Sequence, residues 1–213
     1  MNGFKLQADR FEWTIGFDFE EQAKSEGYSL IAGVDEVGRG CLAGPVVAAA
    51  CILDPAKPVP TGLNDSKKLT EKRRNDIAAE LRETALAYAI GSVEAEEIDR
   101  INILEATKRA MLLAINALQP AADYLLIDAL QLRAVPLPQK PLIKGDSISF
   151  SIAAASVIAK TYRDDLMSAY HKEYPQYGFA GHKGYGAASH FAAIRDHGPC
   201  PLHRKTFRGV MQS

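Results

Sequence analysis

Three short apolar segments of this chain run into acidic residues, two of them directly and one after a glycine. The segments cover residues 30–34, 124–127 and 141–144, and their short length and apolar character are typical of buried strands. The acidic residues at their ends are Asp35 and Glu36, Asp128, and Asp146. If these strands are neighbours in one sheet, their ends bring four carboxylates to a common edge. The alternative is that each acid simply faces water at the end of its strand.

A cluster of four carboxylates repels itself and stays ionised only if cations bind between its members. Because the set contains oxygen ligands and no nearby His or Cys, it favours Mg²⁺ or Mn²⁺ over zinc. Two such ions can activate a water molecule and stabilise the leaving oxygen of a phosphodiester. Adjacent residues of a regular strand point to opposite faces, so we expect Asp35 to be the central ligand and Glu36 the more peripheral one.

The remaining pattern predicts an α/β fold, in which helices cover a mixed sheet. Apolar runs at residues 46–53 and 86–93 predict two further strands, and the first of them should form a hairpin with residues 30–34. Helices are expected at residues 18–25, after an N-cap at Thr70, after an N-cap at Asn102, over residues 147–170 and over residues 187–197. In the helix after Asn102, Glu105 would complete a capping box and Leu104 would lie on the apolar face.

The length of 213 residues fits one principal domain. We place it at residues 29–213 and treat residues 1–28 as an N-terminal extension. No apolar run has the length of a membrane span or the position of a secretory signal, so we expect a cytoplasmic protein with no membrane contact. We also expect the protein to be a monomer. Cys41, Cys51 and Cys200 lack paired spacing and should be free thiols.

The net charge of −1 gives no general attraction to nucleic acid, so such binding would need a local basic patch. Residues 181–213 could supply one, because they hold five Lys or Arg residues against one acid, and four of the five histidines. We therefore predict a basic helical C-terminal segment that starts at about residue 171. A merely solvated tail would have the same composition.

A glycine-rich turn, Gly38-Arg39-Gly40, follows the first pair of acids. Glycines at this place let backbone N–H groups approach a ligand closely, and the guanidinium group of Arg39 can donate to phosphate. An ordinary turn between two strands would also use such glycines.

Taken together, the motifs of the chain resemble those of ribonuclease HII. They occur in order between residues 30 and 207 and read DEVGRG at 35–40, NDSKKL at 64–69, LID at 126–128, KGDS at 144–147, AAASVIAK at 153–160 and HKGYG at 182–186. The GRG form matches type HII, whereas the related type HIII tends to have a lysine there. The resemblance implies a ribonuclease H-like mixed β-sheet of about five strands flanked by helices, with a small helical C-terminal part.

The resemblance also implies roles for individual residues. Asp35, Glu36, Asp128 and Asp146 correspond to the four acidic active-site residues of the family, which would bind Mg²⁺ or Mn²⁺. The turn of Gly38, Arg39 and Gly40 would grip the nucleic-acid backbone and sense the 2′-hydroxyl group, which distinguishes RNA from DNA.

Further residues are assigned to the substrate. Tyr185 matches the family tyrosine that stacks on the deoxyribose after the ribonucleotide, although a packed core tyrosine is the alternative. Lys67 and Lys68 would contact phosphate, unless they are only solubilising. Asp164 would either support the metal site or lie on the surface.

The implied substrates are RNA–DNA hybrids and duplex DNA containing single ribonucleotides, cut on the 5′ side of the ribonucleotide to leave a 3′-hydroxyl and a 5′-phosphate. One alternative is a related nuclease restricted to longer hybrids. Another is a non-catalytic module that only binds hybrids. The departures from the family pattern are Ala187, where many relatives have threonine, and residues 1–28, which match nothing that could be carried over.

Overall fold

The computed structural model describes residues 14–211 of the chain. Its centre is a mixed five-stranded sheet with the strand order β3-β2-β1-β4-β5. The strands are β1 (Ile31–Val37), β2 (Val46–Ile52), β3 (Ala87–Val93), β4 (Tyr124–Asp128) and β5 (Gln139–Leu142). β1 and β2 form the expected antiparallel pair, β3 is antiparallel to β2, and β4 and β5 run parallel to β1. The predicted α/β architecture is confirmed.

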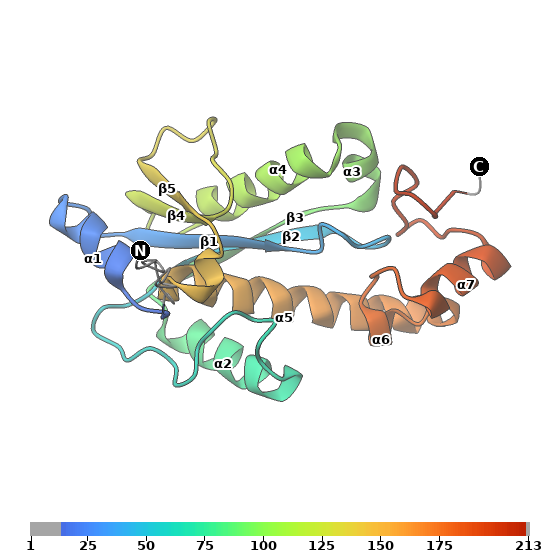
Figure 1. Cartoon of the computed structure of the whole chain (residues 1–213), viewed down its shortest axis with the longest axis horizontal. Helices are drawn as coiled ribbons and strands as arrows, with labels where there is room; N and C mark the ends of the chain where they lie inside the picture. Colours follow the sequence, from blue (N-terminus) through green and yellow to red (C-terminus); the bar gives the residue numbers. More distant parts are fainter. Residues whose placement is uncertain (1–13, 212–213) are drawn as a thin grey trace, which may run out of the picture.

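Helices cover both faces of this sheet (Figure 1). They are α1 (Asp18–Ser25), α2 (Glu71–Thr84), α3 (Ala95–Ile101), α4 (Ile103–Asn116), α5 (Phe150–Glu173), α6 (Phe179–His182) and α7 (Ala188–His197). α4 packs on one face of the sheet, and α5 packs on the other with α2 against it. The short helices α6 and α7 lie at one end of the molecule, next to the C-terminal end of α5 (Figure 1).

The core is divided between the two faces because successive strand residues alternate in direction. Ala32 and Val34 of β1 belong to the cluster under α4, whereas Ala49 of β2 belongs to the cluster under α5. Gly33 faces α5 at very close range, since a Cβ atom added there would lie 2.0 Å from the carbonyl carbon of Ser151. The backbone of α5 therefore contacts β1 directly, which brings the helix beside the acids at the end of that strand.

The expected N-caps are present. The Thr70 side chain accepts from the Arg73 amide at 3.3 Å, and the Asn102 side chain accepts from the amides of Leu104 and Glu105. The reciprocal half of the capping box is not formed, because the Glu105 carboxylate pairs with Lys108 instead. Leu104 is exposed rather than on the apolar face, so that part of the helix prediction was wrong.

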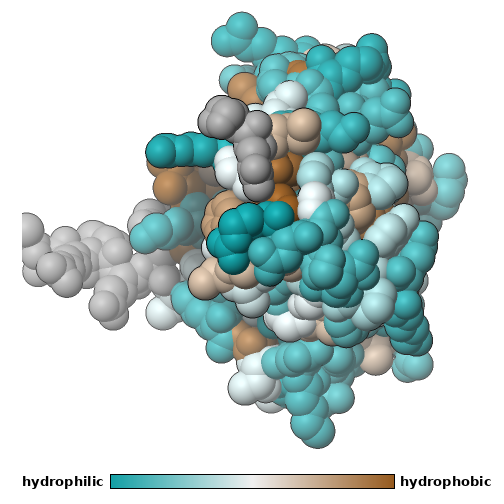
Figure 2. All heavy atoms as spheres, turned by 90° about the vertical axis from the view of Figure 1, so that its right-hand side faces the viewer, coloured by the Kyte–Doolittle hydropathy of each residue, from teal (hydrophilic) through white to brown (hydrophobic). Residues whose placement is uncertain are grey.

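Other differences concern element boundaries. α3 was not predicted, β5 lies two residues earlier than expected, and α5 begins at Phe150 and continues to Glu173. The helix at residues 18–25 is confirmed, although most of the rest of the proposed extension, residues 1–13, lies outside the described part. No helix within residues 14–211 is long and apolar enough to cross a membrane. The end of the molecule that carries α6 and α7 presents a largely hydrophilic surface (Figure 2).

Candidate active site

β1 carries the first two acids. Asp35 pairs with Ala49 of β2 and is 4% exposed. Its Oδ1 atom accepts a hydrogen bond from the Glu36 amide at 2.8 Å, and Ser156 of α5 also hydrogen-bonds to its side chain. The strand stays regular through Glu36, which pairs with Ala48, so Asp35 and Glu36 leave the strand in opposite directions. This register is consistent with a central Asp35 and a more peripheral Glu36.

The other two acids lie at the ends of the neighbouring strands. Asp128 is the last residue of β4 and lies beside Asp35, because β4 is the parallel neighbour of β1. Asp146 is 5% exposed and lies in the 3-10 turn Gly145–Ser147, four residues after the end of β5, rather than directly at a strand end. The Gly145 amide donates to Asp128 Oδ1 at 2.7 Å and ties this turn to β4. All four predicted acids therefore meet at one edge of the sheet.

Lys67 brings a positive charge into this group. Its Nζ atom lies 3.5 Å from Asp146 Oδ2, and its charge also acts on Glu36 and Asp128. Burial alone would lower the pKa of Lys67, but the neighbouring acids, led by Asp146 and Asp35, outweigh it and raise that pKa. The loop that carries Lys67 therefore lies directly beside the acids.

The loop that carries Lys67 also contributes an acid that sequence reasoning did not assign to the site. Asp65 lies beside Asp146 and raises the pKa of that residue. Its position two residues before Lys67 in the NDSKKL motif was the available signal. Lys68 points to a hydroxyl group instead, with Nζ 3.2 Å from Ser147 Oγ.

Burial and mutual repulsion raise the pKa of each predicted acid. The pKa of Asp35 is raised well above its ordinary value, first by burial and then by Glu36 and Asp128. Burial is also the largest cause of the raised pKa values of Glu36, Asp128 and Asp146. The ionised cluster is therefore destabilised by the fold unless a positive charge compensates it.

The donor set fits a divalent cation. Every candidate ligand is a carboxylate, which suits Mg²⁺ or Mn²⁺, and the Oε2 atom of Glu36 is buried without a hydrogen-bond partner among the described residues. Within residues 14–211, no three His, Cys, Asp or Glu side chains are arranged ready-made around one point. Binding of a divalent cation would therefore require the carboxylate side chains to reorient, and Glu36 Oε2 is available as a metal-ligand atom.

The Gly38–Gly40 turn lies against these acids. Arg39 Nη1 is 3.2 Å from Glu36 Oε1. Gly38 has φ +90°, and a Cβ atom there would lie 2.3 Å from Nε of the fully buried Arg163. A Cβ atom at Gly40 would meet nothing within 4 Å. The fold itself thus requires glycine at position 38 but not at position 40.

Two buried arginines hold this turn, and sequence reasoning missed this role for both. Arg163 donates to the carbonyl groups of Ala43, Pro45 and Lys183, and Arg204 donates to those of Gly44 and Arg39. Burial lowers the pKa of Arg204 to about 10. Arg204 had been counted in the basic C-terminal segment, so that segment contributes less surface charge than its composition indicated.

Tyr185 lies on the other side of the turn and is 41% exposed, so it is not a packed core tyrosine. The cationic groups of Lys160 and Arg163 lie 6.0 Å from its ring centroid. The Gly184 carbonyl accepts from the Leu42 amide at 2.8 Å, which connects the HKGYG turn to the chain after Gly40. Tyr185 and the glycine-rich turn therefore form one surface beside the acids.

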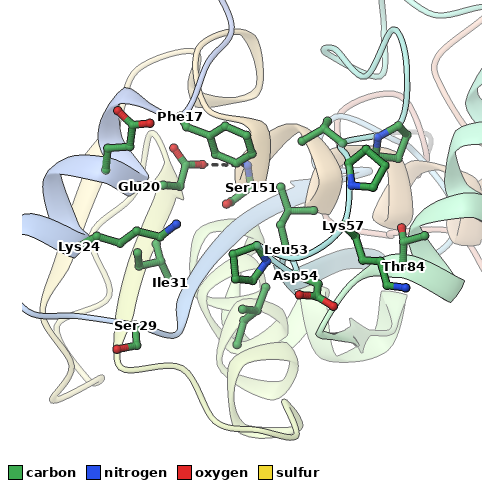
Figure 3. Close-up of a pocket in the computed structure, with 16 residues that line it drawn as sticks. Phe17, Glu20, Lys24, Ser29, Ile31, Leu53, Asp54, Lys57, Thr84 and Ser151 are labelled. Carbon is green, nitrogen blue, oxygen red and sulfur yellow. Dashed lines mark hydrogen bonds between the residues drawn. The ribbon is translucent and has the colours of Figure 1, made fainter.

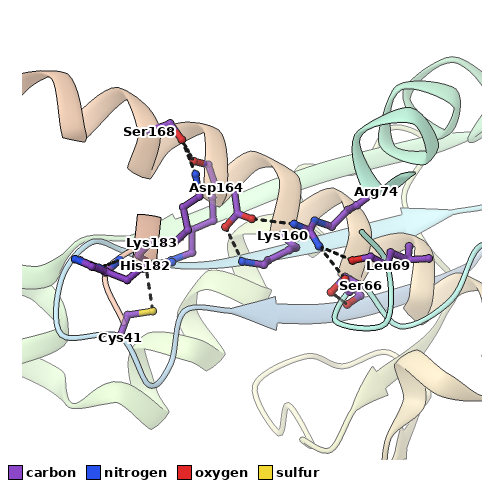
Figure 4. A network of polar contacts seen from close by, with 12 residues as sticks. Cys41, Ser66, Leu69, Arg74, Lys160, Asp164, Ser168, His182 and Lys183 are labelled. Atoms are coloured by element: carbon purple, nitrogen blue, oxygen red, sulfur yellow. Dashed lines mark hydrogen bonds and ion pairs between the residues drawn. The ribbon is translucent and has the colours of Figure 1, made fainter. Parts of the chain in front are cut away.

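Asp164 is buried at the centre of a polar network (Figure 4), so the surface alternative for it was wrong. Its Oδ1 accepts from Lys160 Nζ at 2.6 Å and its Oδ2 from Arg74 Nη2 at 3.3 Å. Arg74 also donates to the Ser66 carbonyl at 3.0 Å. Asp164 thus links the lysine near Tyr185 to the loop that carries Lys67.

A cavity of about 290 Å³ lies away from these residues, at the opposite end of β1 (Figure 3). Glu20 lines it and accepts from the Ser149 hydroxyl at 2.7 Å and the Ser151 amide at 2.9 Å, which anchors the start of α5. None of the described residues around this cavity is a predicted site residue.

The family model for ribonuclease HII matches residues 32–210. A ribonuclease HII of Syntrophotalea carbinolica is 56% identical over 194 residues, which are 91% of this chain and 92% of that protein. The crystal structure of the ribonuclease H2 from Pyrococcus horikoshii OT3 is 25% identical and superposes with a TM-score of 0.71 over 85% of this chain and 95% of that one.

A crystal structure of Bst-RNase HIII in complex with Mn²⁺ is 26% identical to this chain. It superposes with a TM-score of 0.68 and covers 88% of this chain and 70% of that one. The fold and the divalent metal dependence expected from the sequence are confirmed. The chain therefore belongs to the ribonuclease HII family, and it is a metal-dependent ribonuclease H that acts on RNA–DNA hybrids.

Proposed function

We propose that the chain cuts RNA–DNA hybrids and also duplex DNA that contains a single ribonucleotide. Cleavage occurs on the 5′ side of the ribonucleotide and leaves a 3′-hydroxyl and a 5′-phosphate. The observation that carries this proposal is the contact between the acid cluster and the glycine-rich turn, where Arg39 Nη1 lies 3.2 Å from Glu36 Oε1. A turn this close to the hydrolytic carboxylates can read the ribose next to the phosphate that is cut.

In this proposal, Asp35, Glu36, Asp128 and Asp146 hold Mg²⁺ or Mn²⁺. Two ions bound there would supply an activated water molecule and charge stabilisation for the leaving oxygen. The raised pKa values of the four acids support the assignment, because carboxylates that the fold leaves uncompensated bind a cation favourably.

The basic residues around the acids would bind the substrate backbone. Lys67, whose side chain is 74% exposed, and Lys68 present their ammonium groups beside the acids and would contact phosphate. Arg39 is paired with Glu36 in the free protein. If a bound cation neutralised Glu36, the Arg39 guanidinium group would be free to donate to phosphate.

The surface formed by the glycine-rich turn and Tyr185 would select the RNA-to-DNA junction. Backbone groups of Gly38 and Gly40 would sense the 2′-hydroxyl group, and the exposed Tyr185 ring would stack on the following deoxyribose. Because the space beside Gly40 is open in the free protein, Gly40→Ala should fold normally. A loss of cleavage in that variant would therefore report a close approach of the substrate.

The decisive experiment compares three duplexes with purified protein and Mn²⁺: one with a single ribonucleotide, one with a full RNA strand, and one of DNA alone. We expect the first two to be cut and the third to remain intact, with product ends identified by enzymatic labelling. Cleavage of the full RNA strand alone would establish the long-hybrid nuclease instead. Binding of both without cleavage would establish the binding module.

We further propose that the protein acts as a cytoplasmic monomer, with residues 29–213 as the catalytic domain and residues 1–28 as an extension. Light scattering after gel filtration and cell fractionation test the first two statements. Cleavage by a variant that lacks residues 1–28 tests the third, with circular dichroism as the control for folding, because the deletion also removes the bonds of Glu20 to the start of α5.

A further inference from the structure

Buried histidines lie directly behind the HKGYG turn, and the function proposed above does not use them. His190 and His203 are 0% and 1% exposed, and their Nε2 atoms are 3.1 Å apart. His190 Nδ1 lies 2.8 Å from the carbonyl oxygen of Tyr185. The sequence pattern had counted these histidines with the basic tail, but both are enclosed in the fold.

The contacts of the two rings determine where each carries its proton. The Tyr185 carbonyl oxygen can only accept, so His190 donates from Nδ1 and its Nε2 atom must accept. His203 then donates from Nε2 to His190, and its Nδ1 atom is left to accept from the Cys200 amide at 2.9 Å. Each of the four ring nitrogens has a partner, and the set is consistent only when both imidazoles are neutral.

A third histidine holds the same turn from its other side. His182 Nδ1 accepts from the Gly184 amide at 3.2 Å, so its Nε2 atom donates to the Tyr177 carbonyl at 2.8 Å. Its ring stacks on His190 with the ring centroids 4.3 Å apart. The main chain on both sides of Gly184 is therefore bound by two stacked imidazole rings.

We propose that His190, oriented by His203, is a positioning residue that fixes the main chain of Tyr185 and thereby places the tyrosine ring for the RNA-to-DNA junction. This inference rests on the substrate role proposed above for Tyr185. It adds a buried support to a recognition residue that is otherwise 41% exposed. Removing the support should impair recognition of the junction rather than hydrolysis itself.

Added protons would break this arrangement. A charged His190 or His203 would direct a second N–H group at its neighbour's N–H group. Burial lowers the pKa of His190, and burial together with His190 lowers that of His203 to about 4, which agrees with neutral rings near pH 7. The titratable groups facing the pair or its neighbours are His182, Cys200, Tyr177 and Glu173.

Two substitutions of His190 separate its two contacts. In His190→Asn, the side-chain amide takes the place of Nδ1 and can still donate to the Tyr185 carbonyl. In His190→Gln, the longer amide takes the place of Nε2 and leaves that carbonyl without a partner. We expect His190→Gln to raise KM for the single-ribonucleotide duplex by about 10-fold with little change in kcat, and His190→Asn to raise it less than about 2-fold.

The same substitution in a Tyr185→Ala background tests whether His190 acts through Tyr185. We expect His190→Gln to have no further effect on KM there. If Tyr185→Ala raises KM but His190→Gln raises it equally in both backgrounds, the positioning inference is overturned and the proposed role of Tyr185 stands. If Tyr185→Ala leaves KM unchanged, the proposed role of Tyr185 fails, and the inference fails with it.

A measurement on the unaltered protein avoids any folding defect of the variants. Nitrogen NMR of ¹⁵N-histidine-labelled protein at pH 7 should show His190 protonated on Nδ1, and His182 and His203 protonated on Nε2. A His190 ring protonated on Nε2, or a charged ring at any of the three positions, would overturn the inference.

Discussion

The two sides of the Gly38–Gly40 turn differ in how their charged and polar groups are satisfied. On one side, the acids raise one another's pKa, and Glu36 Oε2 has no hydrogen-bond partner within the described part of the chain. On the other side, Arg163 and Arg204 are fully buried but donate to several main-chain carbonyl groups. The acids on the first side need a cation to compensate their charge, whereas the buried arginines on the second side find their hydrogen-bond partners within the protein. In the proposed function, hydrolysis takes place on the side where the fold leaves charge uncompensated, and recognition on the side where buried arginines bond to the main chain.

The largest effect is expected on the acid side, from Asp35→Asn. Cleavage should fall on the order of 10³-fold or more, because a metal ligand is lost, while hybrid binding is retained. In EDTA, the same variant should have a higher Tm than the unaltered protein, because burial raises the pKa of Asp35 and opposes its charge. Asp165→Asn, at an exposed position of α5, is the control for both measurements. Retained turnover would exclude Asp35 as a metal ligand.

On the other side of the turn, Gly38→Ala should reduce stability by roughly 3 kcal/mol, because the residue has φ +90° and its new Cβ atom would collide with Arg163. The matched variant Gly40→Ala should stay within about 0.5 kcal/mol of the unaltered protein. Urea unfolding followed by circular dichroism measures both. Equal stability of the two variants would show that the close packing of Arg163 against Gly38 does not restrict the residue at position 38.

The pH dependence of stability should have opposite signs on the two sides. The fold raises the pKa of the acids, so they favour the folded state below the ordinary carboxyl pKa and oppose it as the pH rises through their folded values. The fold lowers the pKa of His203 from 6.5 to about 4, so its contribution is complete above pH 6.5 and is lost as the pH falls toward 4.

The histidine effect can be isolated because the acids titrate alike in the unaltered protein and in His203→Gln, so their contribution cancels in the comparison. Between pH 7 and pH 5, the unaltered protein should lose up to about 2 kcal/mol through His203, and His203→Gln should lose correspondingly less. Denaturant unfolding at both pH values in EDTA gives the difference. Identical slopes for the two proteins would contradict a buried, neutral His203.

The smallest effect is expected from Lys67→Ala. The side chain of Lys67 is 74% exposed, so its ion pair with Asp146 should contribute less than about 1 kcal/mol. Tm in EDTA should fall slightly, and the fall should shrink when Mg²⁺ supplies the missing positive charge. Lys68→Ala is the control, because that ammonium group contacts a hydroxyl group. A Tm in EDTA above that of the unaltered protein would mean that Lys67 does not compensate the acids.

The sheet and the acid cluster could be predicted from the sequence because both depend on local pattern. β1 and β4 begin as short apolar runs and carry their acids near their C-terminal ends, so parallel neighbours bring Asp35 and Asp128 together. Asp146 was also identified, although β5 lies earlier than expected and a turn separates it from the acid. The helix α3 was missed because it is short and is followed at once by the N-cap of α4.

The supports of the recognition surface could not be predicted because they depend on contacts between distant parts of the chain. Arg204 bonds to carbonyl groups that lie 160 and 165 residues earlier in the chain. An arginine or histidine in a polar segment ordinarily indicates exposed charge, and nothing local distinguishes Arg204 or His203 from Lys205. The roles of the individual site residues remain predictions, and the experiments above address them.

The missing side chain of Gly33 has a mechanical consequence. Because the backbone of α5 rests on β1 at that point, the helix and the strand have a fixed separation that no larger residue could preserve. The same helix carries Ser156 beside Asp35, and further along its length it carries Lys160 and Arg163 beside Tyr185. Ser156, Lys160 and Arg163 belong to one continuous helix, so a larger residue at position 33 would displace α5 and shift its contacts with Asp35 and with Tyr185 together. The proposed hydrolytic and recognition parts of the site are therefore coupled through this helix.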